Sequence, residues 1–422
     1  MRNRRNYLFI IAALPPAIVA CYIFLLGLNI PFWDQWDFLS QLLKIQDTGI
    51  SFEQLISQHN EHRPFFPRII WIGLAQLTQY NVNAELWINF FFALITLVFF
   101  IWQSKKIWSR LDVSPDIWTI PLIVLVVFNL GQWESWLIGF QTIMYLGMLS
   151  VVIGFFLLAK QASPLSFYGA IALGFVANYS MANGLFYWIC GFFILLQFED
   201  RALRLLRLVA WSIFSLISVT FFFHGWQTKS HLDFSYILTH LDSWGIWILN
   251  FLGAPIFTHW HIAWLFGVFG LIFYLVVPLK LSRGQRLIVS PYFAIAIFLI
   301  LTAFAVSSGR FSEDKPSYSV ISRYLTMTSW FWAALIALFP LVEFHYKRWI
   351  YIALTASLAA LMVGGGWVGY ENRYLPVLPA YESAKNNLKI KDTDLGRLYP
   401  DQNKTEILLK KLKDQKLSLY AE

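Results

Sequence analysis

The chain has 422 residues, of which 58% are hydrophobic and only 13% are charged. Soluble domains carry about 25% charged residues, so this composition excludes an ordinary soluble protein. The net charge of +8 does not indicate a nucleic-acid partner, because lysine and arginine collect in the cytoplasmic loops of membrane proteins. Cys21 and Cys190 each lie inside an apolar run, and their positions indicate neither a disulfide nor a metal site.

Apolar runs that approach the thickness of a bilayer core recur along the whole chain, which is typical of a polytopic membrane protein. The first run follows Arg2, Arg4 and Arg5, and it is too long for a signal-peptide core of about 7–15 residues. We therefore expect a retained first span that starts in the cytoplasm. The expected spans are residues 7–30, 84–101, 117–130, 136–159, 167–178, 184–198, 208–224, 260–279, 289–307, 324–342 and 349–368.

The apolar segment 243–257 is left out of these spans because of the charges that follow it. If it crossed the bilayer, Lys280, Arg283 and Arg286 would lie outside. An interfacial or re-entrant placement puts them inside, as the positive-inside rule prefers. The predicted fold is an all-α polytopic bundle of about eleven transmembrane helices, with the N-terminus inside and the C-terminus outside.

Residues 31–83 form the first outer loop, which collects ionisable side chains that the span interiors lack. WDQWDFLSQLLKIQ has helical spacing, SFEQLISQ predicts a short helix behind a serine cap, and PFFPRIIW starts a third helix with Pro67 in its first turn. We expect these helices to lie in the membrane interface. An aromatic belt at that interface would contain Trp33, Trp36, Phe65 and Phe66.

Several motifs together carry a resemblance to a known family: FWDQWDF, QHNEHRPFFPR, FNLGQWESWLIGFQ, NYSMANGLFYW and SGRFSEDKPSYSVISRYLT. With a first span, an acidic opening of the outer loop and a many-span bundle, the chain resembles the GT-C membrane glycosyltransferases. It is similar in plan to bacterial O-antigen-modifying glucosyltransferases, over most of its length up to about residue 326. The resemblance implies a GT-C-like fold in the bacterial plasma membrane with a periplasmic active face. It also implies transfer of a hexose or pentose from a polyprenyl-phosphate donor to an envelope glycan or lipid.

The resemblance also assigns roles to individual residues. The acceptor hydroxyl needs a general base, and the family's adjacent acidic pair is replaced here by an acid-x-x-acid arrangement that offers Asp34 or Asp37. The leaving phosphate needs donors such as the planar guanidinium fork of arginine. The candidates for the donor phosphate are Arg63, Arg310, Arg323 and Tyr324, and those for the substrates are His59, Glu61, His62, Gln132, Glu134 and Asn183.

Structural roles remain open for several of these residues. Arg310 and Arg323 are also placed to snorkel at span ends, and Glu61 is placed to pair with Arg63 as a loop staple. No cofactor is expected. His59 and His62 have the spacing of a metal pair but lack an evident third ligand, so a divalent metal is the less favoured alternative.

The sequence divides into a transmembrane domain, residues 1–369, and a charged segment, residues 370–422, that we expect to form a small outer-side helical appendage. The expected partners are the lipid bilayer, a polyprenyl-phosphate sugar and an envelope acceptor. Three other function classes stay open. A flippase or transporter of lipid-linked saccharides would need a polar path to the inner face. A protein like the O-antigen ligases or polymerases would also act at the outer face, and a non-catalytic envelope scaffold would need none of these residues for transfer.

Overall fold

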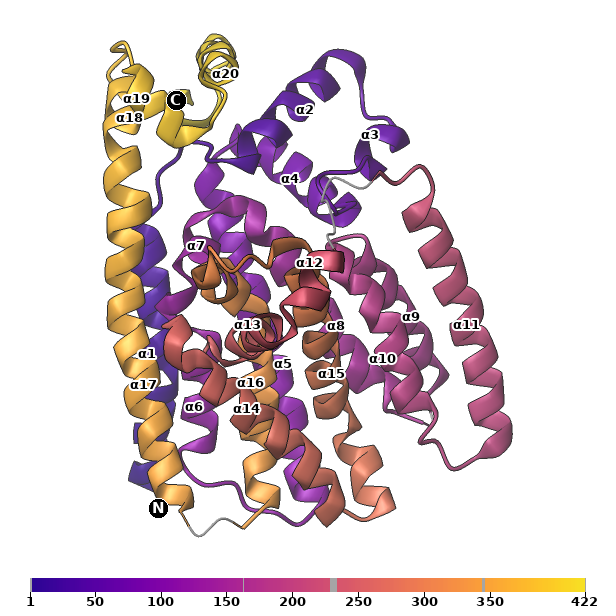
Figure 1. The fold of residues 1–422 in the computed structure, drawn as a ribbon. Coiled ribbons are helices and arrows are strands. Elements are labelled where there is room, and N and C mark those ends of the chain that lie inside the picture. The colour runs from indigo at the N-terminus through magenta and orange to yellow at the C-terminus, as the bar shows by residue number, and fades with distance from the viewer. Residues whose placement is uncertain (1, 162, 228–233, 344–345, 422) are drawn as a thin grey trace.

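The computed structural model describes residues 2–161, 163–227, 234–343 and 346–421, and every regular element within them is helical (Figure 1). The first helices are α1 (Arg2–Leu26), α2 (Asp34–Thr48), α3 (Phe52–Ile56), α4 (Phe65–Thr78), α5 (Val82–Arg110), α6 (Thr119–Val127), α7 (Trp133–Leu137), α8 (Thr142–Leu158), α9 (Pro164–Asn178) and α10 (Phe186–Leu195). The remaining helices are α11 (Arg201–Phe223), α12 (Phe234–Thr239), α13 (Leu241–Gly253), α14 (Trp260–Val276), α15 (Arg283–Arg310), α16 (Ser322–Leu338), α17 (Lys347–Gly369), α18 (Leu375–Lys385), α19 (Asp392–Leu398) and α20 (Gln402–Asp414).

Within the described residues, 8 helical stretches are long and apolar enough to cross a membrane. They are Val82–Arg110, Thr119–Leu137, Gly139–Leu158, Arg201–Phe223, Trp260–Lys280, Arg283–Arg310, Ser322–Leu341 and Lys347–Lys385. Three shorter apolar helices, Ile10–Leu26, Pro164–Asn178 and Ala182–Leu195, coincide with further predicted spans. The structure confirms a polytopic helical protein, whereas the count of eleven crossings stays a prediction.

Several helices begin or end outside the predicted spans, and two of these differences bear on the packing of the bundle. α5 runs on to Arg110 instead of ending at residue 101, because its polar extension is packed inside the bundle: Ser104 is fully buried and accepts a hydrogen bond of 2.8 Å from the Tyr292 hydroxyl. The predicted break around Glu134 is helical, since the 3₁₀ turn Leu130–Gln132 leads directly into α7; the interruption lies earlier, where α6 ends at Val127 and Asn129 has extended backbone angles. The chain turns instead at Ile138, which has extended backbone angles.

The two ends of the bundle carry different structures. The N-terminus lies at one end, and helices α2–α4 and α18–α20 gather at the opposite end (Figure 1). α17 continues through a π-helical turn, Tyr370–Tyr374, into α18, so the predicted boundary between residues 369 and 370 falls inside a continuous helix. α20 packs on α2, which brings the last helix of the chain onto the first outer loop.

α16 is the central helix of the bundle, and every residue from Tyr324 to Leu338 is buried. α13 and α14 form a tight hairpin beside it. A Cβ at Gly253 would lie 1.8 Å from the Ala263 carbonyl oxygen, so the two backbones are in direct contact. α13 has 13 residues and a length of about 20 Å, less than the roughly 30 Å of a bilayer core. The interfacial or re-entrant placement of residues 243–257 stays a prediction.

Candidate active site

The N-terminus of α2 presents two carboxylates at the end of the bundle opposite the chain's N-terminus. Asp34 and Asp37 both lie in the first turn, where negative charge is favourable beside the exposed N–H groups of a helix. The buried residues Phe38, Leu42 and Ile45 fix the orientation of the helix, as their spacing predicted. The aromatic-belt interpretation of Trp36 is wrong, because its side chain is completely buried.

A tight turn places two histidines beside α2. The backbones of His59 and His62 exchange N–H···O hydrogen bonds of 2.8 and 2.9 Å, and Asn60 between them has a φ of 48°. His59 Nε2 lies 3.9 Å from Asp34 Oδ2. His62 Nδ1 accepts a hydrogen bond of 2.9 Å from the Ala182 N–H, which ties the loop to the connection between α9 and α10.

The two histidines are therefore not equivalent. Burial lowers the pKa of His62 to about 4, with Arg310 and His59 acting in the same direction against the acidic Glu61 and Asp34. Because Nδ1 is an acceptor, neutral His62 carries its proton on Nε2. His62 is thus a neutral hydrogen-bond donor at physiological pH, while His59 is the imidazole that faces the Asp34 carboxylate.

Asp34 is ionised in this setting. Burial alone would raise the pKa of its carboxyl, but hydrogen bonding and charge from His59, together with the charges of Arg323 and His62, more than offset burial, so the pKa lies below its ordinary value. Arg323 begins α16, nearly 290 positions later in the chain. The charge on Asp34 is therefore stabilised by a residue at the start of α16, far from the first outer loop in the sequence.

A cavity of about 970 Å³, here called the outer cavity, is lined by Trp33, the residue before Asp34, but not by Asp34 itself. Arg310 at the end of α15 and Arg323 and Tyr324 at the start of α16 line it together, with Trp33, Glu134 and Thr258. One wall descends along α17 through Leu361, Gly364, Gly365 and Val368. The two arginines therefore line one shared cavity, and their predicted role in binding the donor phosphate stays a prediction.

Arg323 is the better placed of the two arginines. Its Cζ lies 5.8 Å from the centre of the Tyr324 ring, and its charge lowers the pKa of the Asp34 carboxyl, whereas Arg310 is not among the groups that act on Asp34. Glu134 contacts its backbone: Glu134 Oε2 accepts from the Arg323 N–H at 3.0 Å, and the Glu134 N–H donates to Ser322 Oγ at 3.1 Å. Glu134 thus fixes the start of α16 and leaves the Arg323 side chain facing the cavity.

Asp37 has a different environment from Asp34. Its Oδ1 accepts a hydrogen bond of 3.0 Å from the Tyr399 hydroxyl and contacts the Lys404 ammonium. Both partners belong to the carboxyl-terminal helices. The structure therefore uses Asp37 to hold the appendage against α2, a role that the sequence did not predict.

Arg63 does not join the predicted donor-phosphate group. Its Nε and Nη2 donate to the carbonyls of Phe222 and His224 at 2.7 and 2.6 Å, and its Nη1 donates to Ile56 at 3.0 Å. The bonds to Phe222 and His224 hold the first outer loop against the end of α11. The predicted pair between Glu61 and Arg63 is also not among the ion pairs of the described residues.

Gln132 and Asn183 also have partners inside the protein. Gln132 is 2% exposed and donates to the Val127 carbonyl within the connection that leads to α7, so the prediction that it binds substrate is wrong. Asn183 donates to Thr302 Oγ1 at 3.1 Å and to Met327 Sδ at 3.3 Å. Its partly buried amide joins the α9–α10 connection to α15 and α16 instead of facing the outer cavity.

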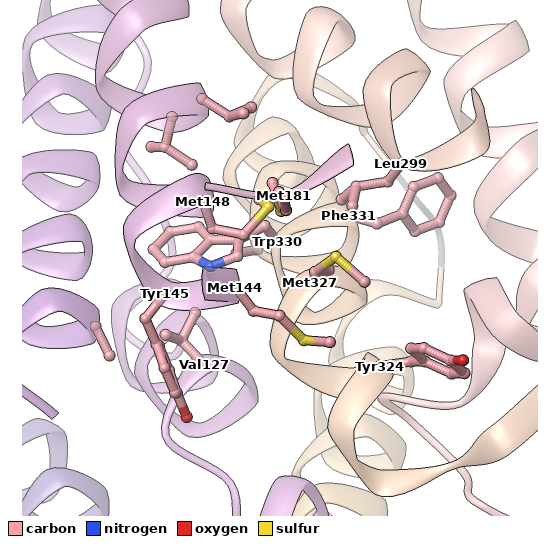
Figure 2. Close-up of a cluster of buried hydrophobic side chains, with 14 of the residues drawn as sticks. Val127, Met144, Tyr145, Met148, Met181, Leu299, Tyr324, Met327, Trp330 and Phe331 are labelled. Atoms are coloured by element: carbon pink, nitrogen blue, oxygen red, sulfur yellow. The ribbon is translucent and has the colours of Figure 1, made fainter. Parts of the chain in front are cut away.

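Methionines fill the interior beneath this region. Met144 and Met148 from α8, Met181 and Met327 converge around Trp330, with Tyr324 at the margin of the cluster (Figure 2). A Cβ at Gly147 would lie 2.7 Å from Met181, so this packing depends on a glycine. Methionine is unbranched and flexible, so these side chains can fill the irregular space between α8 and α16.

Three buried polar contacts near α2 escaped the sequence analysis. Gln35 accepts from the Phe32 N–H and donates to Glu85 Oε2 at 2.7 Å, which supports the start of α2 from beneath. Arg373 is 2% exposed and its Cζ lies 4.2 Å from the centre of the Phe32 ring. Sequence spacing gives no signal for the contacts of Gln35 with Glu85 and of Arg373 with Phe32, because each joins residues that are far apart in the chain.

The described residues include one group with the geometry of a metal site. Asp34, Asp37 and His59 each offer one ligand atom, and these atoms lie within 4.8 Å of one another. The predicted pair of His59 and His62 is replaced by this trio, since Nδ1 of His62 is occupied by the Ala182 N–H. Oxygen and imidazole ligands suit a divalent cation, although Lys404 already neutralises part of the Asp37 charge.

A larger cavity, of about 1150 Å³, lies at the other end of the bundle beside the start of α17. It contains none of the predicted site residues. Lys347, one of its basic residues, is paired with Asp116 at 2.6 Å. The convergent polar groups and the histidine turn therefore belong to the outer end.

Comparison of this chain with family models, with curated proteins and with solved structures finds no match.

Proposed function

We propose that this protein is a GT-C-type membrane glycosyltransferase that moves a sugar from a polyprenyl-phosphate donor to an envelope glycan or lipid. In this proposal a bundle of about eleven transmembrane helices lies in the bacterial plasma membrane with its active face towards the periplasm. Two observations carry the proposal: Arg310, Arg323 and Tyr324 line the outer cavity together with Trp33, and the charge of Arg323 helps to keep the neighbouring Asp34 ionised by lowering the pKa of its carboxyl. Cations for a leaving phosphate and a base for an incoming hydroxyl are the two requirements of this reaction.

In the proposed reaction Asp34 takes the proton of the acceptor hydroxyl. The acceptor oxygen forms a bond to the anomeric carbon of the sugar as the bond from that carbon to the phosphate oxygen breaks. The polyprenyl phosphate leaves with the bonding electron pair, and Arg310 and Arg323 stabilise its added charge. His59, 3.9 Å from Asp34, keeps the carboxylate ionised before the reaction. Asp34 serves as the base without a metal in this scheme.

The α17 wall suits the lipid part of the donor. Leu361, Gly364 and Val368 line the same cavity as the two arginines. They belong to α17, most of which is not buried inside the bundle. A Cβ at Gly364 would meet no atom within 4 Å, so this stretch of the wall is open. A prenyl chain placed there would run from the phosphate end of the cavity into the hydrocarbon core.

Two experiments on a deletion strain and the purified protein test the function. Mass spectrometry of envelope glycans should show the loss of one sugar substituent when the gene is deleted. Purified protein in nanodiscs should then transfer that sugar from its polyprenyl-phosphate carrier to the isolated acceptor, also in the presence of EDTA. Movement of the lipid-linked sugar between leaflets without transfer would instead identify a flippase, and complete dependence on a divalent cation would assign the trio Asp34, Asp37 and His59 a metal.

The side of the membrane is tested separately by cysteine labelling. In a Cys21→Ser background, Ser317→Cys should react with an impermeant thiol reagent on intact cells, while Ser109→Cys should react only after lysis. Both serines are exposed; Ser109 lies in the last turn of α5, and Ser317 lies in the connection between α15 and α16 and lines the outer cavity. The reverse pattern would place the outer cavity in the cytoplasm and end the proposal.

A further inference from the structure

Trp33 is an exposed aromatic residue at the edge of the proposed site. It directly precedes Asp34, its side chain is 50% exposed, and it lines the outer cavity. Tyr318, 40% exposed, and Trp133 line the same cavity. An aromatic belt explains an isolated tryptophan at a membrane surface, but a protein cavity that several aromatic rings share is the usual form of a ligand site.

The backbone of Trp33 is strained. Its φ of 50° and ψ of −124° lie in a region that bulky residues rarely adopt, at a cost of roughly 1–3 kcal/mol. Such a conformation persists only when the surrounding structure enforces it. Strained backbone of this kind clusters at functional positions, where it holds a side chain in a direction that an unstrained backbone would not give it.

The surrounding contacts show how the conformation is enforced. The Trp33 N–H donates to the Leu398 carbonyl at 2.9 Å, and the Trp33 carbonyl accepts from the Trp36 N–H at 2.9 Å. The Phe32 ring meets the Trp33 ring edge-on at 6.1 Å. The buried Arg373 guanidinium contacts that Phe32 ring.

Arg373 supports Trp33 through the Phe32 ring that lies between them. Its Nε and Nη1 are buried and have no hydrogen-bond partner within the described part of the chain. A buried cation without an acceptor is costly, and here its close partner is the face of Phe32. The π-helical turn that holds Arg373 and the carbonyl of Leu398 both come from the carboxyl-terminal region. That region therefore builds the support of Trp33.

We propose that Trp33 is the stacking surface for a pyranose ring of the acceptor, so that the acceptor is a glycan. This inference rests on the proposed function. A pyranose has an apolar C–H face that suits an indole ring and a hydroxyl edge that needs polar partners, which Glu134 and Asn372 supply in the same cavity. The reacting hydroxyl must reach Asp34, the next residue in the chain. The acceptor ring therefore lies against Trp33, and the donor phosphate lies towards Arg310 and Arg323.

Kinetics with both substrates test the assignment. Trp33→Gly removes the ring and relieves the backbone strain, so it is the variant least harmful to the fold. It should raise the KM for the acceptor about tenfold, with a much smaller change in the KM for the donor. Trp33→Phe should recover part of the loss. A larger change for the donor than for the acceptor, or no change for either, would overturn the proposal.

A second measurement separates this inference from the proposed function. The probe is a set of short oligosaccharides released by mild acid from the cell's own envelope polysaccharide, and binding is followed by saturation-transfer NMR. The wild-type protein should saturate ring C–H protons, Trp33→Gly should not, and Trp367→Ala, which removes an exposed aromatic outside the cavity, should behave as wild type. Binding that depends on Trp33 in a protein without transferase activity would uphold this inference and refute the function. Equal binding by Trp33→Gly would refute the inference whatever the activity.

Discussion

The hydroxyl of Tyr399 donates a hydrogen bond to Asp37 across 362 residues of sequence. With Lys404 on the same carboxylate oxygen, this contact joins the carboxyl-terminal helices to the helix that carries Asp34. It also distinguishes the two aspartates, which the sequence left equivalent. Asp37 is committed to a structural partner, and Asp34 faces His59 and the field of Arg323.

The first prediction concerns this contact. Asp37→Asn keeps an acceptor for Tyr399 but loses the charge of the pair, which is about one-third exposed and therefore contributes less than about 1 kcal/mol. Thermal unfolding in detergent should show a small loss of stability, and transfer should stay within about threefold of wild type, well short of the loss expected for a general base.

Lys404→Gln supplies the matched control for Asp37→Asn. It should cause the same loss of stability, and the double variant should add little to either single change, because all three remove one interaction. Abolished transfer in Asp37→Asn with full transfer in Lys404→Gln would make Asp37 the base.

The second prediction separates the arginines. Arg323→Lys replaces a planar fork by a point charge, so it should raise the donor KM or lower kcat at least tenfold by the loss of about 1.4 kcal/mol, with little effect on thermal stability. Arg63→Lys should affect stability and not donor binding, because Arg63 donates to three backbone carbonyls. We expect it to lose roughly 1–3 kcal/mol of stability and to keep its donor KM. If Arg323→Lys is silent, Arg323 only keeps a charge in water.

The third prediction concerns pH. The folded protein holds the pKa of His62 at about 4, whereas an unfolded histidine has a pKa of about 6.5. Between these values the unfolded chain binds the extra proton, so stability is complete above about pH 6.5 and falls as the pH approaches 4. The full loss is on the order of 3 kcal/mol.

His62→Asn provides the comparison for this pH dependence. Its amide oxygen replaces Nδ1 as the acceptor for the Ala182 N–H, but it does not titrate. Melting temperatures measured from pH 4 to pH 7 should therefore fall less steeply with acid in His62→Asn than in wild type. Identical slopes would show that His62 does not titrate in this window.

The sequence predicted the architecture better than the site. Apolar runs identified the long helices, and Ser51 caps α3 with the predicted serine geometry, because both signals are local. Contacts between residues that are far apart in the sequence could not be predicted in this way. Arg63 looked like a ligand for phosphate, but its role depends on carbonyls of α11 that lie about 160 positions away.

Long-range contacts also explain what the sequence missed at α2. The contacts at α2 come from Tyr399, Lys404 and Arg373 in the carboxyl-terminal segment. From the sequence this segment is recognisable only as charged and amphipathic. No periodicity indicates that they reach Asp37 and Phe32. By contrast, Arg310 and Arg323 were identifiable, because each basic residue stands at the outer end of a predicted span and two such ends joined by a short loop must lie close together.

The fourth prediction tests the lipid path along α17. Gly364→Leu places a large side chain where a Cβ meets open space, so it should fold normally while it narrows the outer cavity. We expect the KM for a long-chain polyprenyl donor to rise several-fold and the KM for a short-chain analogue to change little. Gly284→Leu is the control, since that glycine also faces open space but lies at the start of α15. Equal effects of the two variants would exclude this path.

The central claim is that Asp34 is the general base of a sugar-transfer reaction, and the most direct measurement is the single-turnover rate of Asp34→Asn in nanodiscs with saturating donor and acceptor. Asparagine preserves the size of the side chain but cannot take the acceptor's proton. The account predicts a fall of about 10²–10⁴-fold. Asp37→Asn, measured in parallel, should stay within about threefold of wild type. A rate for Asp34→Asn close to that of the wild-type protein would contradict the account.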